Sequence, residues 1–212
     1  MKRLAILFFA IALSGCNWLG IRGNGNIVTD QRQVTDFTEL AASGGLRVEW
    51  HSGPPSVSIR TDENLLQYID ARVTDSKLRI RTRHHLRPTD HIRVTISSPK
   101  FNGADLSGAV DLLAHGLAGP KFYVRAAGAC DITVDGTVDE LLSDITGAGD
   151  LRARSLLART AEVSTTGAGD AVVNVSDTLR VSITGAGDVI YYGNPKNVEK
   201  HITGAGSVKH KQ

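Results

Sequence analysis

The six residues Ile145-Thr146-Gly147-Ala148-Gly149-Asp150 decide the fold, because close copies of them return along the second half of the chain. The copies are Leu106–Asp111, Ala126–Asp131, Thr165–Asp170, Ile183–Asp188 and Ile202–Ser207. Their first glycines stand at 108, 128, 147, 167, 185 and 204, so the gaps are 20, 19, 20, 18 and 19 residues. Repetition at such a period is typical of proteins in which one structural unit stacks on the next.

Apolar residues recur in columns on both sides of these corners. The column before the corner is Leu106, Ala126, Ile145, Thr165, Ile183 and Ile202, and the column after it is Leu112, Ile132, Leu151, Ala171, Val189 and Val208. Alternation of apolar and polar residues with a period of two predicts strands rather than helices. Two or three short strands per 19 residues favour a parallel β-helix-like solenoid, because a β-propeller blade needs about 40 residues.

The corner itself carries two further expectations. Its first glycine supplies a positive φ where the chain turns, and its alanine, which is the same in all six copies, is expected to face a tight interior. The last copy is degenerate, because Lys200 replaces an inward valine and Ser207 replaces the aspartate. We therefore expect a polar terminal cap, with residues 209–212 shielding the sheet edge.

Residues 27–100 are also strand-like, but they repeat less clearly. Leu46–Trp50 and Leu78–Arg81 alternate, and Glu63–Ile69 is the one stretch that suits a helical turn. We expect a sandwich-like sheet that continues into the repeats, so that residues 27–212 form a single all-β domain with regular repeats from about residue 104. Two cysteines are too few for a disulfide framework, and a formal charge of +2 predicts no nucleic-acid partner.

The first residues have the pattern of an export signal. Lys2 and Arg3 precede an apolar run of ten residues, which is too short to span a bilayer as a helix. Leu13-Ser14-Gly15-Cys16 then resembles the bacterial lipobox, which predicts a signal peptide at 1–15 and an acylated Cys16 that bears palmitate, with residues 16–26 as the lipidated end and tether. Asn17 favours the outer membrane, and an ordinary secretory signal is the alternative.

Asp36-Phe37-Thr38-Glu39-Leu40, Ser43–Val48 and the serial Gly-Ala-Gly-Asp corners together resemble the bacterial head GIN domain family over residues 36–208. That family carries an auto-transporter adhesin label. The resemblance implies a right-handed parallel β-helix-like fold in an exported protein. It implies no catalytic residues.

The repeated aspartates are the sharpest candidate for a site. A calcium ladder could use Asp111, Asp131, Asp150, Asp170 and Asp188. The alternative, which the spacing favours, is that each carboxylate accepts backbone N–H groups in its own turn.

Other candidates lie in the strands and loops around the corners. An anionic-ligand surface is expected at Arg79, Arg81, Arg83, Arg87 and Arg93. A hydroxyl ladder could run through Ser107, Thr146, Thr166, Thr184 and Thr203, and His84, His85 and His91 could hold a transition metal with Asp90, although a solvated loop is favoured there.

These features predict a lipid-anchored protein of the bacterial cell envelope that serves as a binding, adhesion or scaffold module. We expect neither catalysis nor a cofactor, and the partners expected are the membrane, a glycan or another envelope protein. A polysaccharide lyase or hydrolase and a structural envelope-stress factor are the alternatives.

Overall fold

The computed structural model describes residues 20–212, so the signal peptide expected at 1–15 and the expected acylation site Cys16 lie outside the described part of the chain. The fold is all-β, with strands making up 73% of the described residues and a single short 3₁₀ helix, η1, at Glu63–Tyr68. No helix within residues 20–212 is long and apolar enough to cross a membrane.

The strands fall into a short, irregular set and a long, regular set. The first set is β1 (Ile21–Arg22), β2 (Ile27–Arg32), β3 (Glu39–Ser52), β4 (Ser56–Asp62), β5 (Ile69–Thr74), β6 (Lys77–Thr82), β7 (Leu86–Arg87) and β8 (Arg93–Ser98). The second set is β9 (Gly103–Gly128), β10 (Asp131–Gly147), β11 (Leu151–Gly167), β12 (Ala171–Gly185), β13 (Asp188–Tyr192), β14 (Asn197–Gly204) and β15 (Ser207–His210).

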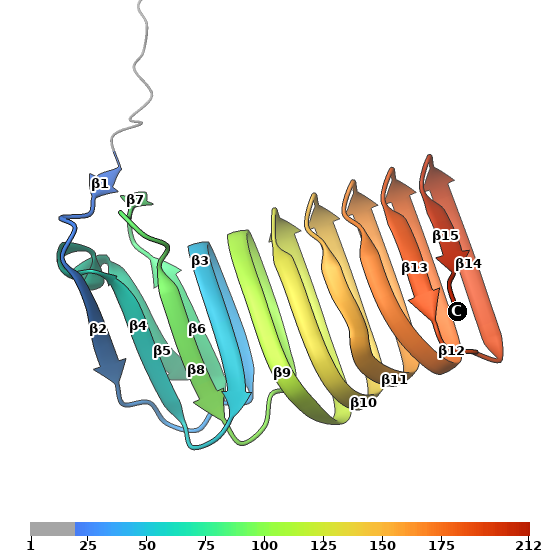
Figure 1. The fold of residues 1–212 in the computed structure, drawn as a ribbon, viewed down its shortest axis with the longest axis horizontal. Coiled ribbons are helices and arrows are strands. Elements are labelled where there is room, and N and C mark those ends of the chain that lie inside the picture. The colour runs from blue at the N-terminus through green and yellow to red at the C-terminus, as the bar shows by residue number, and fades with distance from the viewer. Residues whose placement is uncertain (1–19) are drawn as a thin grey trace, which may run out of the picture.

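Thirteen strands form one mixed sheet that does not close on itself, and β1 pairs with β7 separately. In the sheet order that runs from β3 through β9, β10, β11, β12 and β13 to β15, all neighbouring strands are parallel, and β6 and β8 also pair parallel with β3 (Figure 1). The antiparallel pairs are β2 with β4, β4 with β8, and β5 with β6. The corner glycines lie in one row, since Gly147 pairs with Gly128 on one side and with Gly167 on the other.

The corners divide the molecule into two faces around one core. The pre-corner face contains β5, β6, β14 and segments such as Glu39–Ser43, and the post-corner face contains β2, β4, β8, β13, β15 and segments such as Arg47–Ser52. Inward side chains of both faces join a single hydrophobic cluster. The outward side chains of the two faces therefore point in opposite directions.

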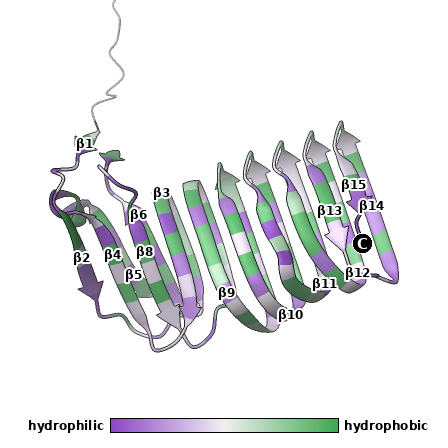
Figure 2. Ribbon diagram, in the orientation of Figure 1, coloured by the Kyte–Doolittle hydropathy of each residue, from purple (hydrophilic) through white to green (hydrophobic). Residues whose placement is uncertain are grey.

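The predicted inward columns are confirmed through the fifth copy of the corner. Ile145 and Ile183 before the corner and Leu151 and Val189 after it are fully buried, and apolar and polar positions alternate along the strands (Figure 2). Only the last copy departs, because Ile202 is 40% exposed.

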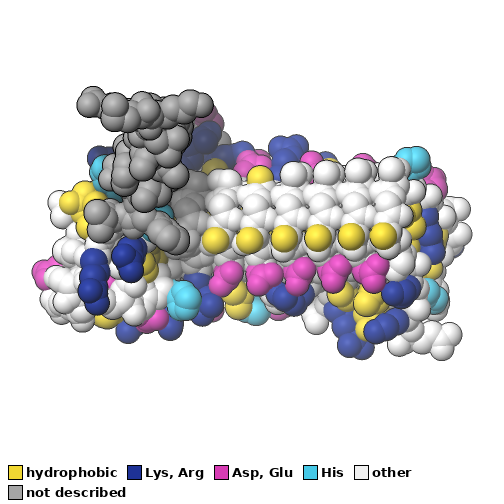
Figure 3. Space-filling view, turned by 90° about the horizontal axis from the view of Figure 1, so that it is seen from above, with side chains coloured by type: hydrophobic (Ala, Val, Ile, Leu, Met, Phe, Trp, Pro, Cys, Tyr) yellow, Lys and Arg dark blue, Asp and Glu magenta, His cyan; other side chains and the backbone are white. Residues whose placement is uncertain are grey.

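The expectation that the corner alanines face the interior is wrong. Ala148 and its counterparts are all exposed, and they form a continuous row on the surface (Figure 3). The two-residue alternation continues through the corner, so Ala148 points outward with Thr146 and Asp150. The inward position belongs to Gly149, where a Cβ would collide with the backbone of Cys130.

The terminal repeat is polar, as expected, but its tail does not shield the edge. Lys209 and His210 belong to β15, which is itself the edge strand beside β13. The Lys200 ammonium lies across the open end of the core and donates to the Val208 carbonyl at 3.3 Å. The edge is therefore protected by an inward-pointing charge rather than by a covering segment.

Candidate functional site

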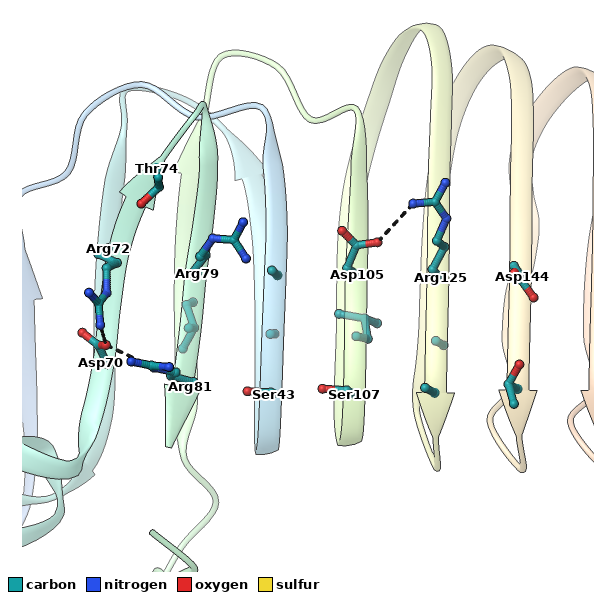
Figure 4. A pocket seen from close by; sticks show the side chains of 17 residues that line it. Ser43, Asp70, Arg72, Thr74, Arg79, Arg81, Asp105, Ser107, Arg125 and Asp144 are labelled. Atoms are coloured by element: carbon teal, nitrogen blue, oxygen red, sulfur yellow. Dashed lines mark hydrogen bonds and ion pairs between the residues drawn. The ribbon is translucent and has the colours of Figure 1, made fainter. Parts of the chain in front are cut away.

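An open groove of about 590 Å³ crosses the pre-corner face near the N-terminal end (Figure 4). Its floor consists of small side chains, and longer charged side chains stand on both sides. We call it the arginine groove; its main members are Ala41, Ser43, Asp70, Arg72, Arg79, Arg81, Asp105, Ser107, Arg125 and Ala127.

Strand register explains why the groove is hollow. Arg79 pairs with Ala41, which pairs with Asp105. Two residues along each strand, Arg81 pairs with Ser43 and Ser43 with Ser107. Neighbouring strands lie about 4.8 Å apart, so the strands of Arg81 and Ala127 are separated by three spacings, or roughly 14 Å. Small residues between them leave a trough wide enough for a sugar ring.

One wall of the groove gathers three guanidinium groups around a single carboxylate. Asp70 accepts hydrogen bonds from Arg72 and from Arg81, the latter at 3.3 Å, and Arg83 lies 4.0 Å away. The hydrogen bond from Arg72 is the main reason that the pKa of Asp70 lies below its usual value. Within residues 20–212, Arg79 has no carboxylate at ion-pair distance, so it is the guanidinium free to meet an anion.

A polar network adjoins one end of the groove, in the row of residues before Arg79 and Asp105. The Lys77 ammonium bridges Asp105 at 2.7 Å and Glu39 at 2.9 Å, and the Tyr123 hydroxyl donates to Glu39 at 2.8 Å. Hydrogen bonding to Asp105 and then to Glu39 raises the pKa of Lys77. Arg125 lies over the Tyr123 ring at 5.2 Å and 3.8 Å from Asp105, which holds its side chain beside the groove.

The structure brings together only part of the predicted arginine set. Arg79 and Arg81 line the groove and Arg83 adjoins it, but Arg87 lies on β7 and Arg93 lies on β8 in the post-corner face, 3.5 Å from Asp90. Two further members of the groove, Arg72 and Arg125, were not expected from the sequence. The pairing of Arg72 with Arg79 in the β5–β6 hairpin was the signal that could have found the first.

The repeated aspartates form a row on the surface along the corner, which we call the carboxylate row (Figure 3). Asp131 and Asp170 are exposed, and Asp111, Asp150 and Asp188 are half-buried. The N–H of Asp170 donates to Oδ1 of Asp150 at 3.2 Å, the N–H of Asp188 to Oδ1 of Asp170 at 2.7 Å, and the N–H of Ser207 to Oδ1 of Asp188 at 2.9 Å. These carboxylates thus cap the next strand rather than their own turn, which corrects the expectation. Because the strands stack in parallel register, each of these three carboxylates lies next to the backbone N–H of the equivalent residue in the following strand.

Cations balance several of these carboxylates. Arg47 lies 3.1 Å from Asp111, Arg152 lies 3.0 Å from Asp150, and Lys209 lies 3.2 Å from Asp188. Residues 20–212 contain no group of three His, Cys, Asp or Glu side chains placed to hold a metal ion. The geometry therefore favours hydrogen bonding over the calcium ladder.

The three loop histidines do not share a site. His84 meets the Tyr68 ring edge-on at 5.3 Å, the His85 carbonyl accepts the Ile21 N–H, and the His91 N–H donates to its neighbour Asp90. Ser107, Thr146 and their counterparts are exposed on the pre-corner face, where they continue the floor of the groove toward the C-terminal end.

A family model matches residues 36–195, which carry both the groove and the whole carboxylate row. The chain belongs to this family. Its description is "Putative auto-transporter adhesin, head GIN domain". No curated protein matches the chain in sequence.

Solved structures share the fold of this head GIN chain. A putative adhesin from Bacteroides fragilis superposes with a TM-score of 0.74 at 21% identity, covering 91% of this chain and 100% of its own. A putative lipid binding protein from Parabacteroides distasonis (TM-score 0.54, 23% identity) and a putative adhesin from Parabacteroides merdae (TM-score 0.52, 20% identity) each cover 91% of this chain and 99% of their own. At these identities the likeness shows the fold alone.

Proposed function

We propose that this head GIN protein is a lipid-anchored binding module of the cell envelope, and that the arginine groove binds an acidic glycan. One observation carries the proposal: Arg79 stands without a partner carboxylate in the described chain, beside a floor of small side chains. A guanidinium presents a planar set of donors that matches a carboxylate or sulfate in two parallel hydrogen bonds. The small floor lets a sugar ring approach the backbone.

The anchor in this proposal is Cys16, which the lipobox-like Leu13-Ser14-Gly15-Cys16 places at the start of the mature chain. Acylation there would hold the domain at the outer membrane, since several acyl chains anchor a protein stably whereas one does so only marginally. The adhesin description of the family supports a location at the cell surface or envelope.

We also propose that the regular strands form a right-handed parallel β-helix with coils of about 19 residues. Support comes from the ladder, because hydrogen-bonded equivalents such as Asp170 and Asp188 or Asp188 and Ser207 are 18 and 19 residues apart.

Neither the family description nor the names of similar structures indicate an enzyme, and we propose no catalytic step. A structural or scaffold role in the envelope is the second candidate. It is favoured if no ligand enters the groove, because the ordered network around Lys77 would then serve stability alone.

Binding of uronic acid or sulfated oligosaccharides to the protein and its variants tests the groove. We expect Arg79→Ala to weaken binding about ten-fold or more, since a hydrogen bond to a charged group contributes roughly 1.5–3 kcal/mol. Arg180→Ala is the matched control, because Arg180 is exposed on the same face but lies outside the groove, 3.1 Å from Glu199. Equal loss in both variants would point to unspecific charge attraction.

Membrane fractionation with metabolic acyl labelling tests the anchor. Cys16→Ala should take no label and leave the membrane fraction. A wild-type protein without label, or a variant that still fractionates with the outer membrane, would contradict lipid anchoring.

A further inference from the structure

The post-corner face carries a second feature, near the C-terminal end, that the function above does not use. Apolar and cationic side chains surround a depression of about 420 Å³ there, and Figure 3 shows hydrophobic side chains among Lys and Arg on this side of the carboxylate row. We call it the aliphatic–cationic patch and define it by Arg152, Arg154, Val172, Ile190, Tyr192, Lys209 and Lys211.

Strand register places the apolar members between the cations. Across β11, β12, β13 and β15, Val172 pairs with Arg152 on one side and with Ile190 on the other, and Ile190 pairs with Lys209. Tyr192 lies two residues beyond Ile190 on the same face. The equivalent outward side chains at the other side of the corner, Thr166 and Thr184, are hydroxylic.

The apolar character extends past the depression. Leu157 is 55% exposed and pairs with Asn174, whose other neighbour is Tyr192. A large aliphatic side chain exposed beside half-buried valine and isoleucine is the kind of surface that marks an interaction site rather than an ordinary wet sheet face.

Two cations of the patch are free to meet an anion. Arg152 and Lys209 pair with Asp150 and Asp188 of the carboxylate row, but no carboxylate in residues 20–212 lies at ion-pair distance from Arg154 or Lys211. Arg154 lies over the Tyr192 ring at 4.2 Å, which holds the guanidinium at the surface. The acidic lining residue, Asp135, already accepts from His115 at 2.6 Å.

From this geometry we propose that the aliphatic–cationic patch docks on an anionic lipid surface. Cations at a membrane meet headgroup phosphates, aliphatic side chains enter the headgroup boundary, and tyrosine is enriched at that depth. The inference rests on the proposed lipid anchor, because a tether at Cys16 raises the local concentration of membrane around a patch that would bind weakly alone. Docking turns the arginine groove, on the opposite face, away from the membrane.

An environment-sensitive fluorophore on an introduced cysteine tests this docking in the full lipidated protein. Ser155→Cys places the label in the patch, and Ser182→Cys is the matched control, exposed on the pre-corner face. Cys130 is buried and does not compete for the label. We expect a blue shift at position 155 on vesicles containing phosphatidylglycerol, with no shift on pure phosphatidylcholine and none at position 182.

Charge reversal at Arg154→Glu and Lys211→Glu should abolish that shift while the protein still floats with the vesicles. A protein that floats without any shift at position 155 overturns the docking and leaves the anchor intact. A wild-type protein that does not float overturns the anchor, and the docking with it. A shift produced by a soluble acidic polysaccharide but not by vesicles would make the patch a glycan site and also overturn docking.

Discussion

The inward column at the corner differs between the two ends of the core, which we call the wide end, near the N-terminus, and the narrow end, near the C-terminus. Near the N-terminal end this column holds Leu46 and Val110, which pair with each other, followed by Cys130. From there on it holds only glycine, at 149, 169, 187 and 206. At the wide end the Trp50 ring stacks on the Phe101 ring, with centroids 5.1 Å apart, and the Phe122 ring lies tilted against Phe101 at 5.6 Å.

The comparison separates two reasons for glycine within one motif. The first glycine of the corner is needed for its backbone conformation, as at Gly147 with φ 125°, where a Cβ would also meet the Gly128 backbone. The second is needed for space, because a Cβ at Gly169 would meet the backbone of Gly149. At the wide end the same position holds Val110 or Cys130, both buried, so the size of the residue at this position follows the space available in the core.

The largest effect is expected at the narrow end. Gly169→Val should lower the free energy of unfolding by about 3 kcal/mol, the upper range for overpacking, because the new side chain meets backbone that cannot rotate away. Cys130→Val at the equivalent wide position should cost less than about 1.5 kcal/mol, as a swap of similar volume. Denaturant unfolding measures both. Equal losses would show that the two ends do not differ in width.

The wide end depends instead on a buried carboxylate. Asp62 accepts the Gly25 N–H at 2.7 Å, and the N–H and hydroxyl of Thr89 at 2.9 and 2.7 Å, so it fastens residues 23–25, which the sequence assigned to a tether, onto the domain. Asp62→Ala should cost on the order of 2 kcal/mol, because the three hydrogen bonds that the buried Asp62 carboxylate accepts are lost. Unfolding melts of the purified protein measure this, with Asp139→Ala as the exposed control.

The same residue gives a pH dependence with a definite sign. Burial raises the pKa of Asp62, but the donors of Thr89 and Gly25 outweigh it, so the folded pKa lies below the ordinary 3.8. Its contribution to stability is therefore complete above about pH 4 and is lost as the pH falls through the folded pKa. Asp62→Asn should flatten the acid limb of stability against pH, and an unchanged acid limb would contradict this role.

A smaller effect is expected in the carboxylate row. Asp170→Ala removes the acceptor of the Asp188 N–H and should cost about 1 kcal/mol, whereas Asp170→Asn keeps an acceptor and should cost less. Chelation of divalent ions should leave the melting temperature unchanged. A rise of many degrees with calcium would restore the calcium ladder.

The smallest effect is expected on the outer side of the corner. Ala148→Leu adds a side chain into solvent, because Ala148 is exposed, and stability should change by no more than about 0.5 kcal/mol. Thermal unfolding beside Gly169→Val makes the contrast direct. A collapse of Ala148→Leu with tolerance of Gly169→Val would reverse the inward and outward sides drawn for this corner.

The sequence contains enough information to orient the corner correctly. Counting in steps of two from Ile145 reaches Gly149 and Leu151, and both are buried, while Thr146, Ala148 and Asp150 lie on the outer side. The prediction failed because sameness across six copies was taken as a sign of burial. A small residue can also recur at exposed positions, where the ladder of backbone hydrogen bonds constrains the backbone and burial does not constrain the side chain.

Local pattern alone determined the all-β class, the inward columns and the family, because a two-residue alternation and a fixed period depend on neighbours in the chain. The arginine groove depended on the tertiary structure. Arg72 and Arg125 reach one trough only because β5, β6, β3 and β9 lie side by side in one register. The same holds for Asp170: its 18-residue spacing from Asp188 is visible in the sequence, but the hydrogen bond from the Asp188 N–H to its carboxylate depends on how the two strands stack.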